Sequence, residues 1–174
     1  MEEVAYEAPA TVANFGPGFD IFGGAMTYPR GDLVSAERIN SRNAVRLVEI
    51  INESGLENLN LTLGPENVVQ AVGQKIYDDL HGTGGIELRL YKRMKIGTGT
   101  GSSASSSVAA ALSVSYLLLE NPLLRSDRRI LEAVVHGESV ATKGLGHADN
   151  VWPCLLGSFI FIYDLRSFFS CLNF

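Results

Sequence analysis

The sequence centres on the stretch Lys95-Ile96-Gly97-Thr98-Gly99-Thr100-Gly101-Ser102-Ser103-Ala104-Ser105-Ser106, in which glycines alternate with threonines before a run of serines. A segment with the pattern of a strand, residues 86–92, precedes it, and a long run of small and apolar residues follows. The pattern therefore predicts a glycine loop that leads into the first turn of a helix. The free N–H groups and the positive dipole end of such a helix favour an anion, most often a phosphate.

The residues of this loop leave more than one interpretation open. The G-x-x-x-x-G-K-[ST] string of a P-loop is absent, so that class is excluded. Gly99, Gly101 and Ala104 satisfy the G-x-G-x-x-A fingerprint of dinucleotide-binding folds. Glu120 lies near the distance expected for the ribose-binding acid, but at the end of a helix instead of the tip of a strand. A merely structural turn is the third interpretation, and the run of serines disfavours it.

Composition narrows the class of protein. The chain has 174 residues, 14 of them Lys or Arg and 19 Asp or Glu, which gives a net charge of −5. This length fits one domain, or one domain and part of another. The negative charge disfavours nucleic-acid binding. The acidic start at residues 1–3 is unlike a secretory signal, and the apolar residues 155–163 are fewer than the ~20 needed to cross a bilayer. We expect a soluble, cytoplasmic protein that binds neither nucleic acid nor membrane.

Hydrophobic patterning predicts an α+β fold. We expect strands over residues 4–8, 31–39, 45–51, 86–92 and 159–163, with a hairpin turn at 40–43. We expect helices over residues 64–82, with an apolar stripe at Val69, Val72, Ile76 and Leu80, over about 102–120, and from Ser126 or Asp127 onward. Residues 9–20 and 143–150 are expected to be loops, and no strand is expected after residue 164.

Two other catalytic constellations are disfavoured. A zinc deaminase signature, H-x-E with P-C-x-x-C, starts at His136, but the place of its second cysteine holds Gly157, so the zinc would lack a ligand. A triad of Ser102, His147 and Asp149 lacks the G-x-S-x-G elbow.

Three motifs, in the right order, resemble those of the GHMP kinase superfamily and, within it, the homoserine kinases. Residues 9–23, P-A-T-V-A-N-F-G-P-G-F-D-I-F-G, are similar to the PATSANLGPGFDxxG opening of these kinases. Residues 97–105 are similar to the phosphate loop P-x-x-x-G-L-G-S-S-A-A. Residues 147–153, H-A-D-N-V-W-P, are similar to the HADNVAP segment. The resemblance runs from about residue 3 to about residue 163.

The resemblance implies a GHMP kinase N-terminal domain over residues 1–164, which is an α+β fold of the ribosomal protein S5 domain 2-like type with a mixed sheet packed against helices. An irregular tail over residues 165–174 would follow. The family also has a C-terminal domain with a third Gly/Ser-rich motif and basic residues for the substrate carboxylate. Nothing similar follows residue 163, so we expect a truncated or frameshifted product. A homodimer is left open.

The resemblance also implies a nucleotide site and a metal site. Residues 95–105 would wrap the triphosphate of ATP, with the helix N-terminus facing the phosphates. Ser102 would help to hold Mg²⁺, with Glu138 as the carboxylate ligand, because this cation binds through few carboxylates together with substrate phosphates. Taken alone, Glu138 would more often be a solvent-facing carboxylate.

For the second substrate, the resemblance implies that Asn14 and Asp20 hold the amino acid L-homoserine, with Asp20 pairing its ammonium group. His147 and Asn150 would line the pocket near the reacting hydroxyl as the catalytic candidates. The reaction would be phosphoryl transfer from ATP to the side-chain hydroxyl, giving O-phospho-L-homoserine in threonine biosynthesis. Such catalysis rests on positioning and charge neutralisation. We assign no general base, because Asn150 cannot take a proton.

The chain departs from the family pattern at several places. Lys95 replaces the usual proline, Thr100 the usual leucine, and Trp152 a small residue. The spacing from Glu138 to His147 is one residue longer than usual. With the C-terminal domain missing, we expect an ATP site with little or no kinase activity in this chain alone. The alternatives are a non-catalytic nucleotide-binding fragment and a dinucleotide-binding oxidoreductase domain.

Overall fold

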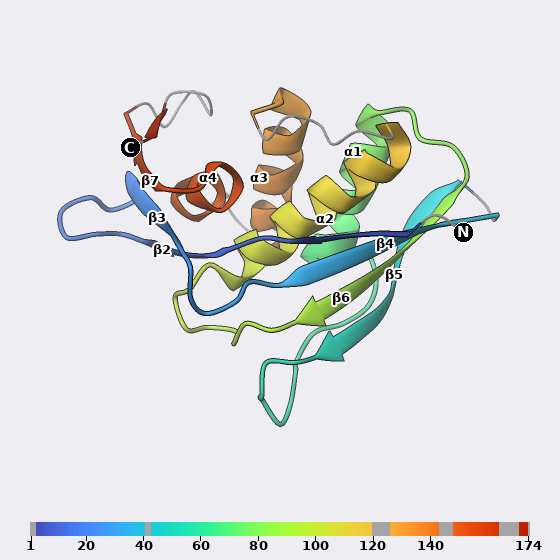
Figure 1. Ribbon diagram of the computed structural model, residues 1–174, viewed down its shortest axis with the longest axis horizontal. Coiled ribbons are helices and arrows are strands. Elements are labelled where there is room, and N and C mark those ends of the chain that lie inside the picture. The colour runs from blue at the N-terminus through green and yellow to red at the C-terminus, as the bar shows by residue number, and fades with distance from the viewer. Residues whose placement is uncertain (1–2, 41–42, 120–125, 143–147, 164–170, 174) are drawn as a thin grey trace.

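The structure is a computed structural model and describes residues 3–40, 43–119, 126–142, 148–163 and 171–173 (Figure 1). Within them lie two four-stranded sheets and four helices. The strands are β1 (Glu3–Glu7), β2 (Ala10–Ala13), β3 (Phe22–Met26), β4 (Leu33–Ile39), β5 (Ala44–Asn52), β6 (Gly85–Lys92), β7 (Phe159–Ile162) and β8 (Cys171–Asn173). The helices are α1 (Val68–Asp79), α2 (Ser102–Leu119), α3 (Arg128–Thr142) and α4 (Ala148–Leu156). This confirms the α+β class.

The first sheet has the strand order β1-β4-β6-β5 and is mixed, because β5 pairs with β6 in parallel and the other pairs are antiparallel. The hairpin expected at residues 40–43 is therefore wrong, since β6 lies between β4 and β5. The reason is the crossover through α1, which returns the chain beside β5 in the parallel direction. Ile86, Leu88 and Leu90 alternate on the buried face of β6 and suit its central place.

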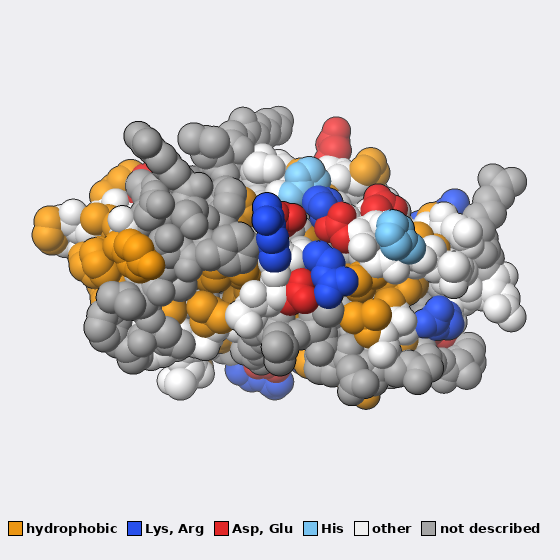
Figure 2. Space-filling model, turned by 90° about the horizontal axis from the view of Figure 1, so that it is seen from above, with side chains coloured by type: hydrophobic (Ala, Val, Ile, Leu, Met, Phe, Trp, Pro, Cys, Tyr) orange, Lys and Arg blue, Asp and Glu red, His pale blue; other side chains and the backbone are white. Residues whose placement is uncertain are grey.

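The second sheet, β2-β3-β7-β8, was predicted less well. Only β7 was expected; β2 lies in the predicted loop, β3 was missed, and β8 lies in the tail where no strand was expected. Gly23 and Gly24 give β3 little strand propensity. The fold needs glycine there, because a Cβ on Gly23 would lie 1.7 Å from the carbonyl oxygen of Asp149. Hydrophobic side chains gather at this end of the molecule (Figure 2), where the rings of Phe15, Phe22 and Phe159 pack together.

The helices lie together on one side of the first sheet (Figure 1), with α2 at the centre of the core. Most of α2 is buried, as expected for its small and apolar residues. Among the described residues α2 alone is long and apolar enough to cross a membrane, and its burial marks it as a core helix. The predicted stripe of α1 is confirmed, with Val69, Val72 and Ile76 fully buried. Asn67 caps this helix by accepting a hydrogen bond from the N–H of Val69, so α1 begins later than expected.

Helix α4 corrects the loop expected over residues 143–150, because Ala148, Asp149 and Asn150 form its first turn. Residues 143–147 lie outside the described residues. Pro153 lies inside α4 and has no N–H to donate to the carbonyl of Asp149. That carbonyl lies against Gly23 of β3 instead. Because Pro153 donates no hydrogen bond at this position, α4 can approach β3 closely there.

Candidate active site

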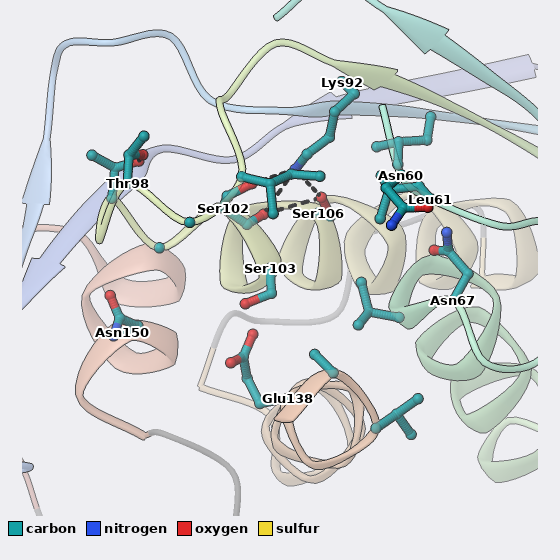
Figure 3. A pocket seen from close by; sticks show the side chains of 18 of the residues that line it. Asn60, Leu61, Asn67, Lys92, Thr98, Ser102, Ser103, Ser106, Glu138 and Asn150 are labelled. Carbon is teal, nitrogen blue, oxygen red and sulfur yellow. Dashed lines mark hydrogen bonds between the residues drawn. The ribbon is translucent and has the colours of Figure 1, made fainter. Parts of the chain in front are cut away.

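A cavity of about 920 Å³ opens where the glycine loop meets α2 (Figure 3). Its walls include the loop at residues 96–101, the first turns of α2, Glu138 of α3, Asn150 of α4, and the segment that leads into the first residue of α1, residues 60–62 and 65–68. The size is that of a site for a nucleotide-sized ligand. The wall at residues 60–68 was not anticipated from the sequence, because it carries no motif.

The glycine loop has an alternating backbone. Gly97, Gly99 and Gly101 have φ values of 77°, 71° and 65°, a region that strongly favours glycine. Between them, the Thr98 hydroxyl donates to the carbonyl of Lys95 at 3.1 Å and lies 2.8 Å from the Thr100 hydroxyl oxygen. Backbone N–H groups in such a loop form concavities that bind anions. The loop therefore has the backbone geometry expected of a phosphate-binding loop at the start of a helix.

Thr11 of β2 anchors this loop. Its N–H donates to the carbonyl of Thr100 at 3.0 Å, and its hydroxyl donates to Oδ1 of Asn150 at 2.9 Å. Asn150 therefore lines the cavity with its carbonyl oxygen engaged, which leaves its NH₂ group as a donor for a ligand. Thr11 was missed in the sequence, where only its place in the first motif singled it out.

Lys92 lines the cavity and forms a buried ion pair with Asp32 behind it, and neither residue was identified from the sequence. The Lys92 ammonium also donates to the hydroxyl groups of Ser102 at 2.5 Å and Ser106 at 3.1 Å (Figure 3). Burial lowers the pKa of Lys92, while the charge of Asp32 acts in the opposite direction. The signal that was available is the period-two pattern of β6, which puts Lys92 on the buried face with Leu88 and Leu90.

The two residues predicted to hold the metal, Ser102 and Glu138, point toward different neighbours (Figure 3). Glu138 is 3% exposed and points toward Ser103, whereas the side chain of Ser102 points toward Lys92 (Figure 3). Consecutive helical residues lie on different faces, so only one of the two serines faces α3. A carboxylate and a hydroxyl are the hard oxygen donors that suit Mg²⁺ shared with phosphates. The described residues contain no group of three or more His, Cys, Asp and Glu side chains that would make an all-protein metal cage.

The predicted substrate residues are only partly brought together. Asn14 lines the cavity, and its Oδ1 accepts a hydrogen bond from the N–H of Asp20 at 2.9 Å. Both residues have positive φ, 63° and 60°, which marks a tightly turned loop. Asp20 is not among the residues that line the cavity. His147 lies outside the described residues.

The family model of the GHMP kinases N terminal domain matches residues 60–158. The chain belongs to the GHMP kinase family. This confirms the family inferred from the three motifs. The mostly antiparallel sheets are also unlike the parallel sheet of a dinucleotide-binding fold, so the oxidoreductase alternative is not supported.

The GHMP kinase domain is similar to curated homoserine kinases. It is 34% identical to that of Pyrococcus furiosus over 159 residues, which are 91% of this chain and 49% of that protein. Identity to the homoserine kinase of Pyrococcus horikoshii is 37%, over the same shares of the two chains. The chain thus spans about half the length of the curated relatives that it matches.

Solved structures of GHMP kinases agree with this fold. A homoserine kinase from Cytophaga hutchinsonii superposes with a TM-score of 0.84 at 32% identity, over 99% of this chain and 52% of that one. A mevalonate kinase from Methanococcus jannaschii gives a TM-score of 0.69 at 16% identity, over 99% and 56% of the two chains, which shows the fold alone.

Proposed function

We propose that the chain is the nucleotide-binding half of a homoserine kinase. The complete enzyme would transfer a phosphoryl group from ATP to the side-chain hydroxyl of L-homoserine, giving O-phospho-L-homoserine for threonine biosynthesis in the cytoplasm. The observation that carries the proposal is the glycine loop, which opens into the cavity at the N-terminus of α2. Several relatives that are 34–37% identical to this chain over the 159 aligned residues are named homoserine kinases.

The triphosphate of ATP would lie along the loop at residues 95–105 and against the first N–H groups of α2, where the helix dipole favours negative charge. Ser103 and Glu138 would hold Mg²⁺, which replaces the predicted pair of Ser102 and Glu138. When bound, this cation neutralises charge on the phosphates. The protein's own part is to hold the phosphates in place and to exclude water from them.

The acceptor would enter between the glycine loop and α4. Asn14 lines that part of the cavity, and the NH₂ group of Asn150 is a donor for the acceptor hydroxyl or for the transferred phosphoryl group. Asp20 stays a candidate partner for the ammonium group of the amino acid, which requires a movement of its loop toward the cavity. His147 stays a candidate at the same pocket. None of these residues is assigned as a general base.

The whole reaction is not expected from these 174 residues, because the relatives named homoserine kinases are about twice as long. We expect the chain to bind ATP saturably and to show little or no phosphorylation of homoserine. A non-catalytic nucleotide-binding fragment is the second candidate, and binding without turnover fits both.

Two assays of the 174-residue chain test the proposal. Calorimetric titration with Mg-ATP is expected to show one site, and titration with NAD is expected to show none. A phosphorylation assay then compares the chain alone with the chain mixed with the C-terminal half of a homoserine kinase. Turnover of homoserine by the mixture supports the kinase over the non-catalytic fragment. Absence of ATP binding under all conditions would refute both.

A further inference from the structure

Lys92 is a charged residue in a place where the fold would accept an apolar one. Its side chain is 3% exposed, and its neighbours on the same face of β6 are Leu88 and Leu90. Lysine is almost never buried without partners, and a buried ion pair is often replaced by apolar residues with no loss of stability. Stability alone therefore does not account for a lysine at the floor of the cavity.

Asp32 is fully engaged and holds the ammonium in one position. Its Oδ1 accepts hydrogen bonds from the N–H groups of Arg93 at 2.9 Å and Met94 at 3.0 Å. Its Oδ2 accepts from the Ser106 hydroxyl at 2.6 Å and from the Lys92 ammonium. These four donors come from β6, from the two residues that follow it and from α2, so Asp32 is held in place and leaves Lys92 little freedom to move.

The same ammonium fastens the first two turns of α2. It donates to the Ser102 hydroxyl at 2.5 Å, and it lies 3.3 Å from the Ser102 carbonyl and 3.1 Å from the Ser106 hydroxyl. These contacts begin at the residue that follows the last glycine of the loop. In Figure 3 the side chain of Ser102 points toward Lys92, while that of Ser103 points toward Glu138.

We propose that Lys92 is a positioning residue for the nucleotide site: it fixes the N-terminus of α2 through Ser102 and so reserves Ser103 for the metal side of the cavity. The proposal rests on the proposed function, because it divides roles within the phosphate site. A hydroxyl oxygen that accepts from an ammonium group has one lone pair engaged and a positive charge beside it. It is therefore a poor ligand for a divalent cation, which the same charge repels.

A double-mutant cycle on the 174-residue chain tests the link, with a fluorescent ATP analogue as the probe. The variants are Lys92→Met/Asp32→Asn, which removes both charges together, Ser102→Ala, and the combination of the two. Each is expected to weaken binding about tenfold, since a hydrogen bond to a charged group is lost. The combination is expected to weaken it by about the same factor, because both changes remove one link. A loss of about a hundredfold, the product of the single effects, would mean that Lys92 acts apart from Ser102 and would overturn the proposal.

A second readout separates the two serines. The ratio of the analogue's affinity with Mg²⁺ to that with EDTA is expected to stay unchanged in Ser102→Ala and to fall about tenfold in Ser103→Ala. The reverse pattern would overturn the proposal, even if the charge-pair variant does not fold. If the Lys92→Met/Asp32→Asn variant does not fold, Ser106→Ala replaces it in the double-mutant cycle. Ser106→Ala removes one hydrogen-bond partner of Lys92 and keeps the ion pair with Asp32.

Ser113→Ala is the matched control on α2. The Ser113 hydroxyl donates to the carbonyl of Val34 at 2.8 Å, and Ser113 does not line the cavity. This variant is expected to lower stability without changing the affinity for the analogue. If the unaltered chain does not bind the analogue, the proposed function fails; if it binds and the cycle is additive, only the role of Lys92 fails.

Discussion

At Gly101 both the backbone conformation and the close neighbours require glycine. Its φ is 65°, and a Cβ there would lie 1.9 Å from the Thr11 hydroxyl and 3.0 Å from Oδ1 of Asn150. The glycine therefore serves backbone conformation and close packing together. Gly97 has a similar φ of 77°, but nothing lies within 4 Å of a Cβ built on it. Substituting these two glycines therefore distinguishes the cost of backbone strain from the cost of a steric clash.

Gly101→Ala is expected to weaken binding of an ATP analogue more than tenfold, because the methyl group must displace Thr11 from the loop. Gly97→Ala carries only the backbone cost, about 1 kcal/mol for a left-handed alanine, or roughly fivefold. Fluorescence titration of the two variants gives both values. Equal losses would show that the Thr11 contact does not matter to the loop.

At the scale of secondary-structure elements, α3 carries Glu138 and depends on its own cap. The N–H of Arg129 donates to Oδ1 of Asp127 at 2.9 Å, and the Arg129 guanidinium pairs with Oδ2 at 2.8 Å. The side-chain hydrogen bond with Arg129, more than any other cause, lowers the pKa of Asp127 below its ordinary 3.8. This cap therefore stabilises the protein fully above that ordinary value, and the contribution is lost as pH falls through the lowered pKa.

Asp127→Asn is expected to remove the part of the pH dependence of stability that comes from Asp127, while its side-chain oxygen still caps α3. Urea unfolding at pH 6 and at pH 3 measures the effect. The stability difference between the two pH values should be smaller in the variant than in the parent chain. Arg129→Gln is the matched variant, since it removes the partner and keeps the carboxylate; it should reduce the same difference. If the stability difference between pH 6 and pH 3 stays unchanged in both variants, the pKa of Asp127 is not lowered by Arg129.

Some helices and strands could be predicted from the sequence and others could not. Helix α2 was predicted from its long run of small and apolar residues, and the stripe of α1 and strand β6 from their hydrophobic periods. The β4–β5 hairpin was wrong because a short turn signal says nothing about a third strand that returns between two others. Lys92 and Thr11 were missed at the site, since a lone lysine in a strand and a lone threonine near a proline have no pattern of their own. Their roles depend on partners far away in the chain.

At the scale of the whole molecule, the cavity joins segments from most of the chain. The hydrogen bond between Thr11 and Asn150 spans 139 residues and closes the site between β2 and α4. A ligand that binds only the folded chain stabilises it by about 2.7 kcal/mol at a concentration of 100 times its Kd. For a chain of this size that corresponds to a rise in Tm of about 5–10 °C.

Mg-ATP at such a concentration is expected to raise the Tm of the chain by that amount in a thermal unfolding scan. Asn150→Ala should lower the Tm without ligand and also reduce the rise, because the Thr11 hydroxyl loses its acceptor and the ligand loses a donor. Ser113→Ala should lower the Tm and leave the rise intact. If Asn150→Ala behaves like Ser113→Ala, Asn150 has a structural role only.

The bond between Thr11 and Asn150 also has a consequence for synthesis on the ribosome. A nascent chain that has emerged as far as α3 already contains the entire glycine loop, but not the amide that accepts from Thr11. The bond from the Thr11 hydroxyl can therefore form only after α4 has left the exit tunnel, whereas the bond from the Thr11 N–H to the Thr100 carbonyl needs only residues that precede α3. Any contact of a nucleotide with the Asn150 amide therefore comes late, after the loop and the first turns of α2 have been made.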